Sequence, residues 1–444
     1  MIGARILAHP ARAVPASFLV AMLIGTALLM LPQAANGPGA SFMTALFTAT
    51  SAVCVTGLVV VDTPVFWSPF GVGVILVLIQ IGGFGIMTGA TLLGLLVGQR
   101  LPLRRRILAQ AETRTLELGD VTGLLKLVAV VTLSVEAVIA VLLTLRLALG
   151  YGEPWPQAAW HGLFHAVSAF NNAGFSTYSD NLVGFASDPL ILSPVMLAII
   201  IGGIGFPVLY ELRRELRRPD TWSVHTKITL LGTLLLLVGG FTMILAYEWS
   251  NPQTLGPLST GEKLLGALFH SVQTRTAGFN SLDIAHLRSE TLVVSEFLMF
   301  VGGGSAGTAG GIKITTFLLL GFVVWAEIRG EQDVTAFRRR ITSDAQRDAL
   351  TIVLLSLGAI ALGTLVMLSV SELPLEAVLF EAVSAFATVG LSTGITAKLP
   401  ESGQLVLVAL MFLGRVGTIT VATALALRPK RRPYRYPEER PIVG

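Results

Sequence analysis

Charged residues are scarce in this sequence. Only 13% of its 444 residues are Asp, Glu, Lys or Arg, whereas a soluble protein has about 25%. Hydrophobic residues make up 53%. This balance excludes a soluble enzyme, a disordered scaffold and a secreted disulfide-rich domain, and it indicates that most of the chain lies in a lipid bilayer.

Cysteine is nearly absent, since Cys54 is the only one. A single cysteine excludes a disulfide framework and a metal site built from cysteine ligands. The sequence also lacks a Gly-Lys-Ser/Thr phosphate loop and a dinucleotide-binding fingerprint in a strand–helix setting. Glycine, by contrast, is abundant: the chain has 46 glycines and 21 prolines, more than simple membrane spans require.

Eight hydrophobic stretches are long enough to cross a bilayer, which takes about 20 apolar residues. The third carries Glu136 and the eighth Arg415, while the sixth is overlong and interrupted. A cleaved signal peptide is the alternative for the first, but that stretch is long enough to span and no small-residue cleavage site leads into a soluble chain. The stretches are Val14–Leu31, Phe70–Val97, Leu127–Leu145, Leu190–Tyr210, Ile228–Tyr247, Leu292–Trp325, Leu350–Ser371 and Leu405–Leu427.

Four shorter apolar pieces alternate with these stretches, and each is too short to span. The order span, short piece, span therefore occurs four times. It predicts an all-α polytopic membrane protein of four helix–loop–helix repeats, with eight spanning helices and four short pore helices. The expected repeats are 1–100, 101–219, 220–340 with a broken second helix, and 341–444 with a C-terminal tail; the short pieces are Phe42–Ser51, Ala159–Phe170, Leu264–Gln273 and Leu375–Phe386.

Basic residues gather on one side of the predicted membrane. The N-terminus, the loops 98–126, 211–227 and 326–349, and the tail after Leu427 hold 24 of the 31 Lys and Arg. The positive-inside rule then places both termini in the cytoplasm.

Glycine-containing loops follow the four short pieces in a common register. Each piece contains a Leu-Phe pair, and the loop glycine lies 10, 10, 9 and 10 residues after the phenylalanine. The third copy is one residue short, so the end of its pore helix is expected to differ locally. The four pairs of phenylalanine and glycine are Phe47 and Gly57, Phe164 and Gly174, Phe269 and Gly278, and Phe380 and Gly390.

A second glycine cluster lies 24 to 28 residues after each loop glycine, on the following span. Small residues are common where membrane helices pack, but two linked markers repeating four times indicate true repeats. The second clusters are Gly82-Gly83, Gly202-Gly203, Gly302-Gly303-Gly304 and Gly414.

Four loops at membrane depth suggest the four walls of one pore. Non-helical backbone is tolerated there only where it lines a cavity or is buried in protein. Backbone carbonyls in such loops can replace the water around a dehydrated cation, and glycine permits the positive φ that turns them inward. The partly negative C-terminal ends of the preceding helices would also favour a cation.

At these loops, at Gly302–Lys313 and at Leu413-Gly414-Arg415, the sequence resembles the Trk/Ktr/HKT superfamily of potassium transporters, over essentially its whole length. Within the superfamily it is most similar to the Ktr-type membrane (KtrB-like) subunit. The resemblance implies four repeats around one pore, with K⁺ held by backbone carbonyls of a selectivity filter. The filter residues it implies are Val55, Thr56, Gly57, Asn172, Ala173, Gly174, Thr276, Ala277, Gly278, Thr388, Val389 and Gly390.

The residue type at the position of Gly57 distinguishes two classes within this superfamily. In some plant relatives a serine replaces the first filter glycine and sodium is favoured. All four glycines are present here, which resembles the potassium-selective pattern. The effect of Cys54, just before the first loop, does not follow from the sequence.

The interruption of the sixth stretch is a candidate gate. Residues 302–311 include six glycines, each of which weakens a helix by roughly 1 kcal/mol. Close packing of small residues against a neighbouring helix is an equally good explanation from sequence alone. The resemblance implies an intramembrane gate loop below the filter; the implied gate residues are Gly304, Ser305, Ala306, Gly307, Thr308, Ala309, Gly310, Gly311, Lys313 and Arg415.

Two cations belong to this candidate gate. Arg415 lies within a span, where a charge is rare and usually faces the bundle interior. It is expected to resist cation passage and to contact the gate loop; a structural salt bridge, for instance with Glu296, is the alternative. Lys313 either tethers the loop or extends toward the cytoplasm.

For the other polar residues at membrane depth, structural roles are the favoured interpretation. We expect Arg275 to brace the third loop through backbone hydrogen bonds, with Glu381 as a candidate partner, rather than to act in permeation. His165 and His270 occupy positions equivalent to Glu381, and helix packing is favoured over metal binding. Glu136 is either a proton-relay acid or part of a buried structural pair.

The sequence therefore predicts a potassium-selective uptake pore rather than an enzyme. A Na⁺- or H⁺-coupled potassium symporter, with Na⁺ as coupling or regulatory ion, is the alternative; a membrane-embedded enzyme has no acid–base or metal cluster to support it. No covalent cofactor and no nucleic-acid partner are expected.

The resemblance implies a homodimer in the bacterial cell membrane that works with a cytoplasmic nucleotide-binding ring (KtrA-like). The basic segments are candidate docking surfaces for that ring, although topology and contact with anionic lipids explain them equally. These segments are Arg213–Arg218, Arg338–Arg340 and Arg428–Arg435.

Overall fold

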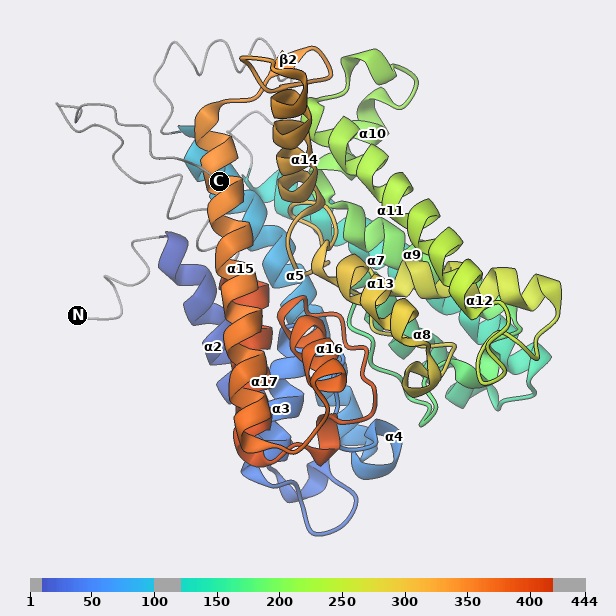
Figure 1. Cartoon of the computed structure of the whole chain (residues 1–444). Coiled ribbons are helices and arrows are strands. Elements are labelled where there is room, and N and C mark those ends of the chain that lie inside the picture. Colours follow the sequence, from blue (N-terminus) through green and yellow to red (C-terminus); the bar gives the residue numbers. More distant parts are fainter. Residues whose placement is uncertain (1–9, 100–120, 418–444) are drawn as a thin grey trace, which may run out of the picture.

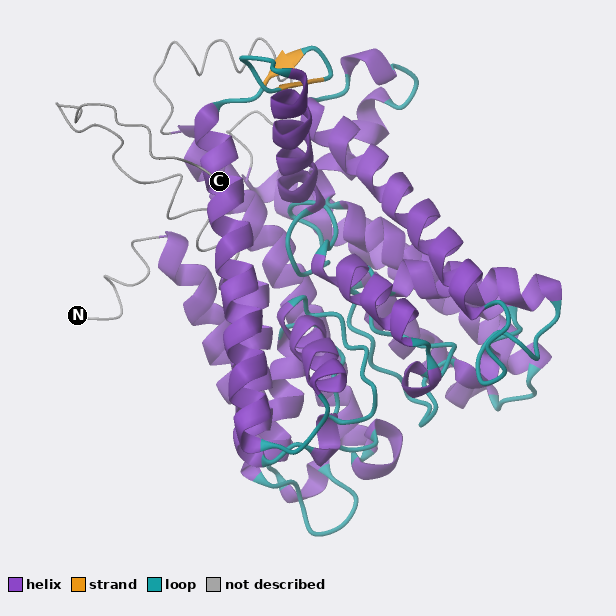
Figure 2. Ribbon diagram, in the orientation of Figure 1, coloured by secondary structure: helices purple, strands orange, loops and turns teal. Residues whose placement is uncertain are grey.

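Helices make up most of the structure (Figures 1 and 2). The computed structural model describes residues 10–99 and 121–417. The tail Arg428–Arg435 and most of the basic loop 98–126 lie outside the described residues. The helices are α2 (Pro10–Leu29), α3 (Phe42–Val53), α4 (Thr63–Phe66), α5 (Pro69–Gln99), α7 (Val121–Gly150), α8 (Trp155–Phe170), α9 (Pro189–Ile204), α10 (Phe206–Glu215), α11 (Val224–Glu248), α12 (Thr260–Gln273), α13 (Ser289–Phe300), α14 (Ile314–Arg329), α15 (Ser343–Val370), α16 (Leu375–Phe386) and α17 (Glu401–Phe412), with a π-helical turn at Leu413–Gly417.

The long apolar helices confirm the all-α membrane architecture that the sequence predicts. Four of them, α5, α7, α11 and α15, are each long and apolar enough to cross a bilayer. Large apolar side chains point outward on these helices: Leu133, Leu234 and Leu362 are 60–65% exposed. This outward apolar surface suits contact with lipid.

The fourth predicted span is bent rather than continuous, which corrects the prediction of one helix over Leu190–Tyr210. Its two halves, α9 and α10, meet at an angle of 98°. Gly205 breaks the helix between them with a φ of 100°, and the next turn contains Pro207, which has no N–H to continue the helical hydrogen bonds. The freed Phe206 N–H instead donates to the carbonyl of Ala306, 3.3 Å away.

The sixth predicted span is interrupted by a long loop, visible between α13 and α14 in Figure 2. The loop leaves α13 after Phe300 and enters α14 at Ile314. Its two ends lie together in a parallel bridge between Val301 and Ile312, and the Gly302 N–H donates to the Ile312 carbonyl (2.9 Å). The segment is therefore a loop that leaves the helix after α13 and returns to the same place before α14 begins.

The four short helices begin at recognisable sequence signals. Ser41 caps α3 by accepting a hydrogen bond from the N–H of Thr44, and Ser259 and Glu262 form a capping box at α12. Helices α8 and α16 begin after Pro154 and Pro374. Each short helix then runs into an extended loop in the interior of the molecule (Figure 2).

At the other end of the molecule, α14 leads into a hairpin of β1 (Thr335–Ala336) and β2 (Arg339–Arg340) (Figure 1). Its two turn residues have positive φ, and the ring of Phe337 meets that of Phe322 on α14 edge to face, with centroids 6.5 Å apart. The hairpin is thereby packed on the helix that follows the interrupted segment.

In three of the repeats, a glycine of the second cluster allows the short helix to pack directly against the helix that follows its loop. A Cβ atom added to Gly82, Gly202 or Gly414 would collide with the backbone carbonyl oxygen of Val53, Phe170 or Phe386, respectively. These carbonyls belong to the last residues of α3, α8 and α16. The glycines therefore fix how closely each short helix packs against the helix that follows its loop.

We expect Gly82→Ala to lower the unfolding free energy by about 1–3 kcal/mol, because the methyl group overpacks the contact with Val53. The thermal midpoint of the detergent-purified protein measures this effect. Gly358→Ala on α15 is the matched control, since a Cβ atom there meets nothing within 4 Å. If the two variants melt alike, this close packing does not matter for stability.

Candidate functional site

The four interior loops form a closed ring. A Cβ atom added to any loop glycine would collide with the carbonyl oxygen of the residue before the glycine in another loop. These contacts join the first loop to the second, the second to the third, the third to the fourth and the fourth back to the first. The contacts run from Gly57 to Ala173, Gly174 to Ala277, Gly278 to Val389 and Gly390 to Thr56.

Each loop has the same alternation of backbone conformation. Two residues that flank a central residue have positive φ, between 50° and 97°, and the second of them is always the loop glycine. Alternation in the sign of φ can turn successive carbonyls toward one side, as carbonyl-lined filters require. Three of the four non-glycine residues are β-branched, for which positive φ is a costly outlier that marks functional sites. The four are Val55, Asn172, Thr276 and Thr388.

Serines on three short helices hold these loops, and the sequence reasoning missed them. The Oγ atoms of Ser51 and Ser384 each accept from the N–H of their loop glycine (3.1 Å), while Ser168 Oγ donates to the Phe175 carbonyl (2.8 Å). Each serine lies six residues before its loop glycine. That fixed spacing was the signal available in the sequence.

The third loop differs, as its shorter spacing predicts. In the other three loops the central residue donates its N–H to the carbonyl five residues earlier, as Ala173 does to Ser168 (2.7 Å). In the third loop Ala277 donates to Gln273, only four residues earlier (2.9 Å). Gln273 occupies the position of the bracing serine, four residues after the phenylalanine of the short helix, so the third loop lacks the hydroxyl that holds the others.

The segment between α13 and α14 packs directly against the ring. The N–H groups of Gly304 and Thr308 donate to the carbonyls of Gly203 and Gly202 on α9 (2.8 and 3.1 Å). Thr308 Oγ1 donates to the carbonyl of Phe170, at the end of α8 (3.1 Å). The Gly310 N–H donates to Thr276 Oγ1 in the third loop (3.1 Å).

Two cationic side chains hold the same segment. Arg415 is 2% exposed and donates through Nη1 to the carbonyl of Thr308. Within residues 10–99 and 121–417 no ion pair joins Arg415 to Glu296, so the salt-bridge alternative is not supported. Lys313 Nζ donates to the carbonyl of Ala309 (2.6 Å), which favours tethering of the segment over extension toward the cytoplasm.

Arg275 and Glu381 are not partners, which corrects the pairing suggested from sequence. Glu381 accepts hydrogen bonds from the hydroxyl groups of Ser392 and Thr396. Its carboxylate is thereby satisfied by the loop that follows the fourth glycine. Arg275 instead donates to backbone carbonyls of α11 and of the segment between α13 and α14.

The two histidines occupy packing positions. His165 Nε2 lies 3.0 Å from Ser176 Oγ, beyond the second loop glycine, and His270 Nε2 lies 3.0 Å from Ser295 Oγ on α13. Among the residues that the structure describes, no group of three or more His, Cys, Asp or Glu side chains could hold a metal ion.

Glu136 supports the second loop through hydrogen bonds with Asn171 and Gln80. Asn171 donates through Nδ2 to Glu136 Oε1 (3.1 Å) and to Gln80 Oε1 (2.9 Å), and Gln80 donates to the other carboxylate oxygen (3.2 Å). Glu136 is 4% exposed, and within the part of the chain that the structure describes its carboxylate is hydrogen-bonded to amides rather than to a basic side chain.

Comparisons with known proteins agree with this geometry. A family profile described as "TrkH: Cation transport protein" matches residues 6–434. The crystal structure of the potassium transporter TrkH from Vibrio parahaemolyticus has the same fold, with a TM-score of 0.71 and 18% identity, covering 94% of this chain and 85% of that one.

Curated relatives are similar over nearly their whole length. The chain is 40% identical to Ktr system potassium uptake protein B of Bacillus subtilis (98% of this chain, 97% of the relative). It is 38% identical to the protein of the same name from Vibrio alginolyticus (96% and 93%) and 35% identical to potassium/sodium uptake protein NtpJ of Enterococcus hirae (98% and 97%). The chain therefore belongs to the TrkH family of cation transport proteins.

Proposed function

We propose that this protein is the membrane subunit of a potassium uptake system and that K⁺ passes through the ring of four loops. The observation that carries the proposal is the closed ring of carbonyl-to-glycine contacts. The names of the relatives from B. subtilis and V. alginolyticus support potassium as the ion.

The ring would select the ion through its backbone oxygens. A K⁺ ion that enters must lose water, and carbonyls held at fixed positions replace those water ligands. The residues proposed for the filter are buried and uncharged, so no ring of carboxylate side chains lines it. The C-terminal ends of α3, α8, α12 and α16 lead into the ring, and their partial negative charge stabilises a cation there.

The segment of residues 304–311, with Lys313 and Arg415, is proposed as the gate. Its hydrogen bonds to α8, α9 and the third loop support a position on the permeation path. A guanidinium group bound to the Thr308 carbonyl adds positive charge, which opposes the passage of a cation. Opening would require this segment to move and exchange several backbone hydrogen bonds.

A coupled symporter is the second candidate. One relative is a potassium/sodium uptake protein, and the buried Glu136 is a carboxylate that could exchange a proton or bind Na⁺ beside the second loop. A channel gives flux that is linear in the driving force without a co-ion, whereas a symporter requires one.

We further propose four repeats, 1–100, 101–219, 220–340 and 341–444, with both termini in the cytoplasm of a cell-membrane homodimer. A cytoplasmic nucleotide-binding ring is the proposed regulator. The hairpin at Arg338–Arg340 supports this, because α14 connects it to the proposed gate. Arg213 and Arg214, in the last turn of α10, extend the basic surface.

Expression of this protein in a bacterium that lacks its own potassium uptake should restore growth at low potassium, with a further increase when a cytoplasmic nucleotide-binding partner is supplied. The purified protein in liposomes should conduct K⁺. Absence of flux from folded protein in liposomes, together with no rescue of growth, would contradict the proposed function.

Gly57→Ser should reduce the discrimination between K⁺ and Na⁺ by about tenfold, because the added side chain meets the Ala173 carbonyl and strains a φ of 93°. Reversal potentials in mixed salts measure the change. Gly152→Ser, at an outer glycine whose φ is 69° but whose Cβ position is open, is the matched control. Unchanged reversal potentials in Gly57→Ser would refute a filter at this position.

Deletion of residues 305–310 should raise K⁺ flux by at least about tenfold, a change of about 1.4 kcal/mol, because it removes the proposed plug. The ends of the segment already lie together, since the Ile314 N–H donates to the Gly303 carbonyl (3.0 Å). Flux per folded protein in liposomes is the measurement. Wild-type or lower flux from an intact fold would show that the segment is not a gate.

A further inference from the structure

Arg275 connects the third loop to the start of the segment between α13 and α14. It directly precedes Thr276 in the ring and is 7% exposed. Its Nη1 donates to the Thr233 carbonyl on α11 (3.1 Å), and its Nη2 donates to the Gly302 carbonyl (3.3 Å). The Arg275 side chain thus holds both α11, which lies outside the ring, and the first residues of the segment between α13 and α14.

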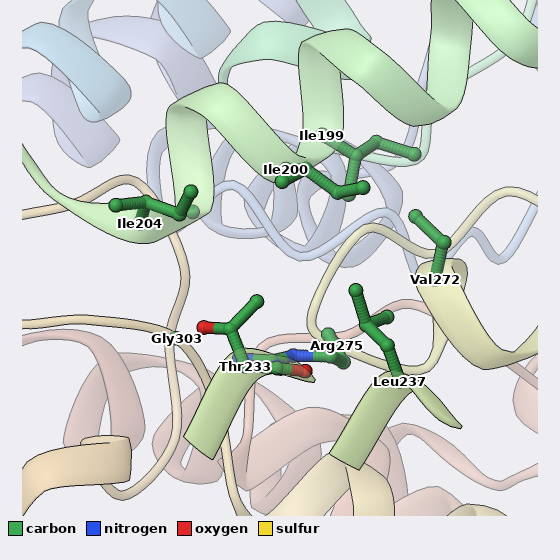
Figure 3. A pocket seen from close by; sticks show the side chains of 9 residues that line it. Ile199, Ile200, Ile204, Thr233, Leu237, Val272, Arg275 and Gly303 are labelled. Atoms are coloured by element: carbon green, nitrogen blue, oxygen red, sulfur yellow. The ribbon is translucent and has the colours of Figure 1, made fainter. Parts of the chain in front are cut away.

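The surroundings of this guanidinium are largely apolar. Arg275 lines a cavity of about 20 Å³, room for about one water molecule, with isoleucines of α9 opposite (Figure 3). Figure 3 shows its side chain extending toward Thr233. Hydrogen bonds between a charged donor and carbonyls are strong in such surroundings, because little water competes for either group.

The carbonyls that the guanidinium of Arg275 contacts lie outside the ring of loops. Thr233 lies on α11 and Gly302 precedes the segment, whereas the ring is closed by contacts among the loop glycines and the carbonyls before them. The guanidinium therefore acts on the ring only through the backbone that it holds.

The third loop also holds the far end of the segment. Thr276 Oγ1, on the residue after Arg275, accepts from the Gly310 N–H (3.1 Å). The third short helix, α12, carries Gln273 where the other short helices carry a bracing serine. The conformation of the third loop therefore depends on the segment more than the conformation of the other three loops does.

We propose that Arg275 is a positioning residue that couples the third loop of the ring to the gate. It fastens the start of the segment while Thr276 fastens the end, so the segment leaves the ring only when the Arg275–Gly302 contact breaks. This inference rests on the proposed function of the segment as a gate.

A double-mutant cycle in liposomes tests the coupling. R275Q should raise K⁺ flux about tenfold, because the segment loses its attachment at Gly302. In protein that lacks residues 305–310, R275Q should add nothing, since there is no gate left to release. R288Q is the matched control and should leave flux unchanged: Arg288 is exposed and bonds only the Ser250 hydroxyl through its guanidinium.

The outcomes separate this proposal from the gate itself. If the deletion raises flux but R275Q either has no effect or raises flux equally in both backgrounds, Arg275 does not act through the gate and the coupling is refuted. If the deletion alone changes nothing, the gate proposal fails and the coupling fails with it. A purely structural role would lower the thermal midpoint without raising flux, which also overturns the proposal.

If R275Q does not fold, the R275K variant tests the proposal instead. Lysine keeps the buried charge but cannot span two carbonyls with a planar fork. Flux about threefold above wild type, with faster amide hydrogen exchange at residues 302–311, would support the coupling. Wild-type flux and exchange in R275K would overturn it.

Discussion

Backbone polar groups that leave a helix inside an apolar bundle must find partners, and this requirement shapes the whole interior. The four loops and the segment between α13 and α14 expose such groups at depth. The loops use serine hydroxyl groups and the carbonyls of their own short helices. The segment uses α9, the third loop, Arg415 and Lys313. The ring of loops and the segment are therefore neighbours because hydrogen bonds between them satisfy polar groups of both.

The helices were predictable because lipid imposes strong patterns on a sequence. Apolar length located α5, α7, α11 and α15, and the Leu-Phe register located the short helices closely; α16 has the predicted bounds. The repeated glycines predicted the loops, and the glycine run at 302–311 predicted the interruption between α13 and α14, whereas α5 is continuous through Gly82 and Gly83. These features depend on local composition and spacing, which a single sequence records directly.

Other features depend on contacts between residues that are distant in the sequence, and the spacing of residues along the chain could not predict them. At the bend, the N–H that Gly205 frees is satisfied by the carbonyl of Ala306, which is far away in the sequence. Arg275 and Glu381 looked like partners because each is a buried charge, yet backbone carbonyls and hydroxyl groups satisfy them separately. The Arg415 contact with Thr308 agrees with the role that resemblance implied, but its atoms were not predictable.

Gln273 stands where the other three short helices have a bracing serine, which makes one wall of the ring unlike the other three. A pore assembled from four identical subunits could not have such a wall, since any change would appear four times. A single polypeptide that supplies all four loops escapes this symmetry. It can hold three walls of the ring with serine hydroxyl groups and leave the fourth in contact with the segment between α13 and α14, so that a movement of that segment reaches one wall and not the other three.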